Sequence, residues 1–264
     1  MQDEEYRTVF VCEDSMEGIL SGIYAAYESR LPLKNVELMV KTEASPRLFT
    51  RYTDVINDPV KAQKVSRTLR KRLGEENYYD FCMILTSCQE RKAQGAFAVV
   101  QWVLQNRIYK SIFEHMTDDD IGHAFRCYRH ANFEMMHLRG FLRFAELKGG
   151  VLYAEAEPKN NIIVYLAEHF ADRLPMEHFI ICDKGRDLYA VHPAGKDWIL
   201  LKGLSEEEKI SEAKLSDAEI YYQELFCRFC ESLSIKERRN LNLQRNMLPI
   251  RFRPYMTEFK HHGK

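Results

Sequence analysis

Residues 140–174 read GFLRFAELKGGVLYAEAEPKNNIIVYLAEHFADRL, and this stretch decides the fold class. Two extended segments, Phe141–Leu147 and Val151–Glu157, flank Gly149-Gly150, a dipeptide typical of hairpin turns. The segment Asn161–Leu174 then carries apolar residues three and four positions apart, which is the period of an amphipathic helix. A hairpin followed directly by a helix predicts an α+β unit.

The sequence on either side of this stretch extends the pattern. Before it, a helix is predicted over Asp118–Arg139, and Gly140 is expected to end it. After it, helices are expected at Ser205–Lys214 and Asp217–Leu233, and the tail from Ser234 is basic. Short strands are predicted at Phe179–Cys182, Leu188–His192 and Trp198–Leu201. The second half of the chain is therefore predicted as helix, hairpin, helix and strands, with an antiparallel sheet.

The first half is predicted to be mainly helical with a few short strands. The strands are expected at Tyr6–Cys12, Val36–Val40 and Leu48–Tyr52. Asp14, with Glu17 three residues later, predicts a capped helix that runs to about Arg30. Asp58-Pro59 predicts the start of a second helix, which Gly74 is expected to end. Further helices are predicted at Tyr78–Ser87 and Gln89–Tyr109.

The change of pattern along the chain places a domain boundary near Met116–Asp118. This boundary gives a mixed, mostly helical region over residues 1–116 and an α+β region with a basic tail over residues 117–264. The length allows one large or two small domains, so the two regions could also pack as one domain.

Charge and composition exclude several classes of protein. The chain has 38 basic and 39 acidic residues, so a polyanion binder of high pI is not indicated and any nucleic-acid surface must be local. No apolar run approaches the roughly 18–20 residues of a membrane span, and the acidic start, Met1–Glu5, does not resemble a secretory signal. Seven cysteines without framework spacing fit free thiols in a reducing compartment, so we expect a cytoplasmic protein without membrane contact.

The cysteines also bear on metal binding. Cys227 and Cys230 form a lone CxxC motif, with no second CxxC and no close pair of histidines. Zinc sites of this kind need four ligands at defined spacing. We therefore expect two half-buried thiols on a helix, and we predict neither a metal nor a cofactor.

Two segments concentrate basic residues. Residues 61–72 hold six basic residues and no acidic one, and Lys64, Arg67 and Lys71 lie opposite the apolar face of the predicted helix. This face could attract phosphates, or it could be an ordinary solvated surface. Residues 236–264 hold eight basic residues against two acidic ones, and Arg238 and Arg245 are candidate nucleic-acid contacts there. The alternative is that this tail packs across the acidic stretch at residues 205–219.

Isolated arginines mark a further candidate. Arg139 and Arg143 flank Gly140, where the helix is expected to give way to a strand. Arg143 lies within the apolar stretch Phe141–Phe144, so its guanidinium is expected to be partly enclosed and to need an anion. That anion could be a carboxylate such as Glu155, or the phosphate of a substrate.

A histidine and an aspartate complete the candidate site. His169 and Arg173 are four residues apart and share a helix face, Asp183 ends a predicted strand, and Arg186 follows it. His169, Arg173 and Asp183 are the candidate catalytic residues, because such groups can carry acid–base chemistry or hold a phosphate. The same residues could equally form one structural hydrogen-bonded network.

Six motifs occur along nearly the whole chain in an order that resembles a known family. They are Phe10–Ser15 with Glu17–Ile19; Asp58 with Lys61-Ala62 and Lys64-Val65; Gly140–Phe144; Glu157–Asn160; His169–Pro175; and Ile235–Asn240 with Gln244 and Pro249. The family is that of bacterial probable DNA metabolism or DNA repair proteins, named as companions of a radical S-adenosylmethionine protein. The C-terminal region also resembles a domain of unknown function fused to some uracil-DNA-glycosylase-like proteins.

The resemblance implies a DNA-associated accessory protein that acts with a radical S-adenosylmethionine partner. The partner would carry the iron–sulfur cluster, because Cys82 and Cys88 have no third cysteine ligand nearby in the sequence. Two alternatives remain open. The protein could be a stand-alone enzyme that acts on nucleic acid through Arg143, His169, Arg173 and Asp183, or a non-catalytic module that binds another protein.

Overall fold

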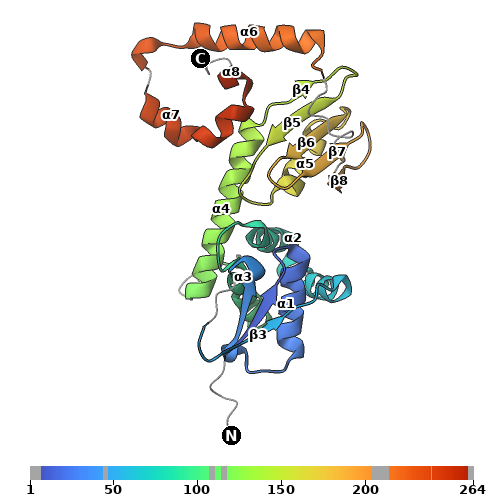
Figure 1. The fold of residues 1–264 in the computed structure, drawn as a ribbon, viewed down its shortest axis with the longest axis vertical. Helices are drawn as coiled ribbons and strands as arrows, with labels where there is room; N and C mark the ends of the chain where they lie inside the picture. The colour runs from blue at the N-terminus through green and yellow to red at the C-terminus, as the bar shows by residue number, and fades with distance from the viewer. Residues whose placement is uncertain are drawn as a thin grey trace. The chain divides into compact units, whose positions relative to one another are not determined.

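The computed structural model in Figure 1 describes residues 7–43, 47–106, 111–113, 118–203, 214–238 and 240–260. The chain divides into two compact units, Met1–Phe133 and Glu134–Lys264, and the division falls within α4 (Asp119–Phe141). The predicted domain boundary at residues 116 and 117 lies outside the described residues. The predicted α+β class is confirmed, with a mainly helical first half and a five-stranded sheet in the second.

The first unit contains a three-stranded parallel sheet in the order β2-β1-β3. Its strands are β1 (Arg7–Cys12), β2 (Val36–Val40) and β3 (Thr50–Asp54), of which β3 begins two residues later than predicted. Parallel neighbours need a crossover, and α1 (Met16–Glu28) supplies it between β1 and β2. The N-cap of α1 is Ser15 rather than the predicted Asp14, because Ser15 has an extended backbone and its hydroxyl accepts a hydrogen bond from the Gly18 N–H at 3.0 Å.

Helix α2 (Pro59–Thr86) starts and breaks where the sequence predicts. The Asp58 carboxylate caps it by accepting hydrogen bonds from the backbone N–H groups of Val60 and Lys61, at 2.9 and 3.1 Å. Gly74 interrupts the helix with φ of 74° and ψ of 171°, a backbone conformation that is essentially restricted to glycine. The predicted helix at Tyr78–Ser87 is the segment of α2 beyond this kink.

We expect Gly74→Ala to lower the free energy of unfolding by about 1–3 kcal/mol, because an alanine is strained in the backbone conformation at this φ. No atom lies within 4 Å of the position that the new Cβ would take, so the loss would come from the backbone alone. Gly140→Ala is the matched control. Gly140 is helical and equally open, so alanine there should be neutral or stabilise by about 0.5–1 kcal/mol. Urea unfolding of the two variants measures both effects.

The remaining helices of the first unit pack closely on each other. Helix α3 (Lys92–Gln105) is shorter than the predicted Gln89–Tyr109, whose residues 107–109 lie outside the described residues. Gly95 of α3 lies against Ala124 of α4, where an added Cβ would stand 3.2 Å from the alanine backbone. The core of this unit is apolar, and its fully buried side chains include Phe81, Phe97, Ile19, Ile23, Met83 and Ile84.

The second unit contains a five-stranded sheet in the order β4-β5-β6-β7-β8. The strands are β4 (Ala145–Glu146), β5 (Leu152–Ala156), β6 (Phe179–Asp183), β7 (Leu188–His192) and β8 (Ile199–Lys202). The turn between β4 and β5 contains Gly149 and Gly150, both with positive φ, as the hairpin signal predicts. Neighbouring strands are antiparallel except β5 and β6, which are parallel because α5 (Ile163–Arg173) crosses between them.

Helix α5 covers one face of this sheet (Figure 1). Phe179 and Ile181 of β6 are buried there, together with Ile163 and Leu166 of α5. Helix α4 runs through Gly140 to Phe141, so the expected stop at Gly140 is wrong: the glycine lies in the last turn with helical backbone. No helix among the described residues is long and apolar enough to span a membrane.

The C-terminal part of the unit is made of short helices after α6 (Asp217–Leu233). They are η4 (Lys236–Arg238), α7 (Leu241–Met247), η5 (Ile250–Tyr255) and α8 (Thr257–Lys260). The prediction of a helix at Asp217–Leu233 is confirmed. The predicted helix at Ser205–Lys214 lies, except for its last residue, outside the described residues.

Candidate functional site

A cleft of about 490 Å³ opens beside the carboxyl ends of the parallel strands β5 and β6. The loop Glu157–Asn160 leaves β5, and the turn Asp183–Arg186 leaves β6. Segment η5 supplies the remaining wall with Arg251 and Tyr255. In sheets with parallel strands, ligands bind outside the carboxyl ends of those strands, so this edge is the natural position for a site in the second unit.

Buried Glu134 on α4 holds the Glu157–Asn160 loop in place. Its carboxylate accepts hydrogen bonds from the backbone N–H groups of Lys159 and Asn160, at 3.0 and 2.8 Å, and from the Asn160 side-chain amide. The Arg251 guanidinium lies 3.0 Å from the same carboxylate. Glu134 is 1% exposed, so these contacts compensate a charge that burial alone would make very costly.

Arg186 holds the Glu157–Asn160 loop through its backbone carbonyl groups. It forms an ion pair with Asp183 at 3.0 Å and donates hydrogen bonds to the carbonyl oxygens of Pro158, at 2.8 Å, and Lys159. Asp183 is buried, and this burial raises the pKa of its carboxyl while the neighbouring Arg186 acts in the opposite direction. The sequence hypothesis of an internal network around Asp183 therefore has a specific geometry: Asp183 orients Arg186, and Arg186 holds the loop.

Glu157 and Tyr255 face each other at the mouth of the cleft. The Tyr255 hydroxyl donates a hydrogen bond to the Glu157 carboxylate at 2.9 Å. Burial, together with this carboxylate, raises the pKa of Tyr255 to about 12, so the phenol keeps its proton at neutral pH. The pair offers an exposed carboxylate next to a neutral donor, which is a combination that can bind a polar ligand or move a proton.

Arg143 has an internal partner, as one of the two sequence readings expects. Its guanidinium forms an ion pair with Glu258 of α8 at 2.8 Å and donates a hydrogen bond to the Gly140 carbonyl at 2.9 Å. The partner is not Glu155, the carboxylate suggested by the sequence. Glu155 instead lies 3.4 Å from the Lys184 ammonium and accepts a hydrogen bond from the Tyr153 hydroxyl.

His169 of α5 is half-buried, with its ring edge-on to Phe170. Burial lowers the pKa of His169, and the positive charges of Arg139 and Arg173 lower it further. Arg173 itself is exposed, at the end of α5. A shared catalytic site of His169, Arg173, Asp183 and Arg143 stays a prediction.

We expect His169 to titrate below its ordinary pKa of 6.5, and Arg173→Ala to move the midpoint upward by removing a like charge. Proton NMR of the imidazole signals measures both midpoints, and Lys196→Ala serves as a control that removes an exposed cation elsewhere. Because the folded state disfavours protonation, His169 should make the free energy of unfolding fall as the pH falls through 6.5. An unchanged midpoint in Arg173→Ala would contradict the electrostatic explanation.

The basic face of α2 is the second candidate surface. Two of its cations form ion pairs: Lys61 with Glu28 at 2.7 Å, and Arg70 with Glu75 at 3.4 Å. Three others, Lys64, Arg67 and Lys71, are exposed as predicted and form no ion pair within the described residues. They are spaced by three and four residues, so they form one row along the helix, which we call the α2 cation row.

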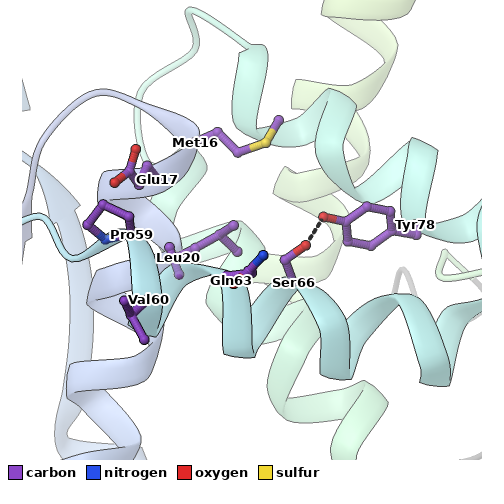
Figure 2. Close-up of a pocket in the computed structure, with 9 residues that line it drawn as sticks. Met16, Glu17, Leu20, Pro59, Val60, Gln63, Ser66 and Tyr78 are labelled. Carbon is purple, nitrogen blue, oxygen red and sulfur yellow. Dashed lines mark hydrogen bonds between the residues drawn. The ribbon is translucent and has the colours of Figure 1, made fainter.

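A pocket of about 550 Å³ lies beside the first turns of α2 (Figure 2). Met16 and Leu20 of α1 line it with Pro59 and Val60, and its lining is mainly apolar. At its other end the Ser66 and Tyr78 hydroxyls are hydrogen-bonded at 2.6 Å, across the kink of α2 (Figure 2). This contact joins the two segments of α2 across its kink.

The sequence model of one protein family, described as a domain of unknown function (DUF4130), matches residues 91–258, which is more than half of the chain. The chain belongs to the DUF4130 family. The match supports the resemblance to an uncharacterised domain family. A search of curated proteins finds no match. The DUF4130 match spans Glu134, the Glu157–Asn160 loop, Arg251 and Glu258, whereas the α2 cation row precedes it.

Two arginines of the basic tail of the DUF4130 chain make internal contacts. Arg251 pairs with Glu134, and the Arg253 guanidinium lies over the Phe259 ring, so these two cations hold the structure together. Arg238 and Arg245 are exposed. Arg239 and Lys264, and most of the acidic stretch at residues 205–219, lie outside the described residues.

The CxxC cysteines lie on α6, half-buried, as expected. The Cys227 thiol donates a hydrogen bond to the Thr257 carbonyl at 3.6 Å. Among the residues that the structure describes, no three histidine, cysteine or acidic side chains are grouped to hold a metal ion.

Sequence reasoning did not find Glu134, Glu157 or Tyr255 as functional positions. A signal for Glu134 exists, because it is the sole acidic residue between Arg126 and Arg143, in a segment rich in arginine and histidine. An isolated acid in such a segment is a candidate for a buried, multiply bonded carboxylate. Tyr255 carries no comparable signal, because its role depends on a residue 98 positions earlier in the chain.

Proposed function

We propose that this DUF4130 protein is a DNA-associated accessory protein in DNA metabolism or repair, and that it acts with a radical S-adenosylmethionine partner. The observation that carries the DNA contact is the α2 cation row. Lys64, Arg67 and Lys71 are exposed and without ion pairs in the described part of the chain. Exposed cations in a row along a helix attract phosphates and release the counterions condensed on DNA.

The dimensions of the row suit a nucleic-acid backbone. Residues 64–71 cover about 10 Å of helix at a rise of about 1.5 Å per residue, which is enough to meet several phosphates of a duplex. The chain as a whole has a net charge of −1, so attraction to DNA depends on local basic surfaces such as this one. The proposed binding is therefore nonspecific in sequence, and micromolar or weaker at physiological salt.

The resemblance of the motifs to the family of radical S-adenosylmethionine companions supports the proposed partner. The motifs with the most specific match, Gly140–Phe144 and His169–Pro175, lie within the DUF4130 match. Arg143 of the first motif and His169 of the second belong to the second unit, so this unit is the proposed contact for the partner.

Binding of the purified protein to a labelled DNA duplex, followed by fluorescence anisotropy, tests the DNA part of the proposal. We expect binding that weakens steeply between about 50 and 200 mM salt. Co-purification from native cells, followed by the same titration with and without the recovered partner, tests the accessory role. Absence of binding at low salt, with and without the partner, would contradict the proposal.

A stand-alone enzyme that acts on nucleic acid is the second candidate function. The cleft beside β5 and β6 favours it, because the Glu157 carboxylate and the Tyr255 phenol face each other where ligands bind to parallel strands. Turnover of a nucleic-acid substrate by the isolated protein, and its loss in Glu157→Gln, would support this candidate over the accessory role.

A further inference from the structure

Helix α6 carries a continuous apolar surface that nothing in the described part of the chain covers. Its outer stripe, as we call it, consists of six large apolar side chains that are between 39% and 63% exposed: Tyr221, Tyr222, Leu225, Phe226, Phe229 and Leu233. Ala218 and Ser232 complete the same face, so the stripe contains no charged residue. Helices of monomeric proteins normally turn such a face toward their own core.

A different face of α6 contacts the rest of its unit. Cys227 is hydrogen-bonded to the Thr257 carbonyl of α8, and the Glu219 carboxylate accepts a hydrogen bond from the Glu146 N–H at 3.1 Å. Half-buried residues on α6 recur at Glu219, Gln223, Cys227 and Cys230, whereas the other positions of the helix are exposed. The helix is thus fixed by one face, and its most apolar face is exposed. Figure 1 shows α6 at the periphery of the unit.

The spacing of the stripe is that of a helix–helix seam. Ala218, Tyr222, Leu225, Phe229 and Ser232 follow one another at intervals of four, three, four and three residues. This alternation places successive side chains along one line of the helix, as in the contact line of paired helices. The outer stripe is therefore suited to a second helix rather than to a small molecule.

We propose that α6 pairs with the α6 of a second copy of this chain, in antiparallel orientation, to form a symmetric dimer. With the midpoint of the pair at the level of Cys227 along the helix axis, Leu225 of one copy lies opposite Phe229 of the other. Tyr222 lies opposite Ser232, so a large side chain meets a small one. A twofold axis makes each of these contacts occur twice, which is the arrangement of most homodimers.

The charges on the flank of α6 select this orientation. Glu224 and Arg228 form an ion pair within the helix. In the antiparallel pair, Glu224 of one copy lies within about one helical turn of Arg228 of the other, so opposite charges meet. In a parallel pair, this flank would face the other flank of the partner helix, where Phe226 and Leu233 lie, so Arg228 would meet no opposite charge there.

The exposed area of the outer stripe is sufficient for such an interface. Aromatic side chains bury about 150–250 Å² each, so the six half-exposed residues offer roughly 600 Å². Stable interfaces bury about 800 Å² on each partner, including a polar rim. An exposed apolar patch of this size on a lone monomer is at the upper limit of what soluble proteins show, and such patches mark interaction sites.

Sedimentation equilibrium of the full chain tests the proposal. We expect the wild-type protein to dimerise with a Kd in the micromolar range or below, and Phe229→Glu to weaken the dimer at least about 100-fold, because it places a charge in the seam. Ile220→Glu is the matched control. Ile220 and Phe229 are both 55% exposed on the same helix, but Ile220 lies outside the stripe, so its variant should stay dimeric.

The flank charges give a second, independent test. Glu224→Arg or Arg228→Glu alone should weaken the dimer about 3–10-fold, and the double exchange should restore it, because opposite charges meet again. Circular dichroism of each variant verifies the fold. A wild-type protein that stays monomeric at a concentration of about 100 μM would overturn the proposal. A dimer that the Phe229→Glu change leaves intact would overturn it as well. If the outer stripe binds only a different protein, the purified wild-type chain would stay monomeric, and the proposal would be overturned.

Discussion

Replacing Glu134 by alanine is expected to lower the free energy of unfolding of the second unit by about 2–4 kcal/mol, because the change leaves backbone N–H groups of the Glu157–Asn160 loop without acceptors in a buried position. The side chain is buried and joins three separate parts of the unit: α4, the Glu157–Asn160 loop and η5. Alanine would leave the Arg251 guanidinium without its carboxylate and two backbone N–H groups without acceptors. Urea unfolding followed by circular dichroism measures the loss.

Two further variants separate the cause of this loss from a general effect of lost charge. Glu134→Gln keeps the shape but replaces one acceptor oxygen by a donor that faces N–H groups, so it should also destabilise the unit, by less than alanine. Glu168→Gln removes an exposed carboxylate of α5 and should change the free energy of unfolding by less than about 0.5 kcal/mol. A loss below about 1 kcal/mol in Glu134→Ala would show that the loop does not depend on this carboxylate.

Reversing all three charges of the α2 cation row is expected to weaken DNA binding by about 100-fold or more at low salt. The triple variant Lys64→Glu, Arg67→Glu, Lys71→Glu removes three phosphate contacts and adds three repulsive charges at the same surface. The exposed positions leave the fold intact, which a thermal melt verifies. Anisotropy titration with a labelled duplex measures the change.

A control of equal net charge decides whether position matters. Lys148→Glu, Lys196→Glu and Lys202→Glu reverse three exposed lysines of the second unit and change the net charge by the same amount. If the α2 cation row contacts the phosphates, the control should lose little binding free energy. Its loss should be less than about a third of the loss in the α2 triple variant. Equal losses in the two variants would mean that only net charge matters, and the row would lose its role.

Local signals in the sequence account for most of the elements. Asp58-Pro59 caps α2, Gly74 breaks it, and Gly149-Gly150 turns the hairpin, because each acts through the backbone of its own segment. The pairing of the strands could not be predicted from such local signals. Nothing near β3 in the sequence shows that it pairs in parallel with β1, because pairing is decided by contacts between distant segments.

The same distinction holds for the candidate site. The enclosure of Arg143 and its need for an anion follow from its apolar neighbours, but its partner Glu258 lies 115 residues later. Counting charges in the tail grouped Arg251 with Arg245, and the fold distinguishes them: Arg251 pairs with buried Glu134, whereas Arg245 forms no ion pair within the described residues. The sequence of α2 likewise does not show which of its six cations form ion pairs. In the fold, Lys61 and Arg70 pair with carboxylates.

The salt dependence of DNA affinity tests the central claim most directly, because its slope counts phosphate contacts and is insensitive to added repulsion. The variant Lys64→Ala, Arg67→Ala, Lys71→Ala removes the three contacts without reversing charge. The slope of log affinity against log salt for a duplex should then be shallower than that of the wild-type protein by about 2–3, from about 0.9 for each contact. Equal slopes for the two proteins would contradict the account.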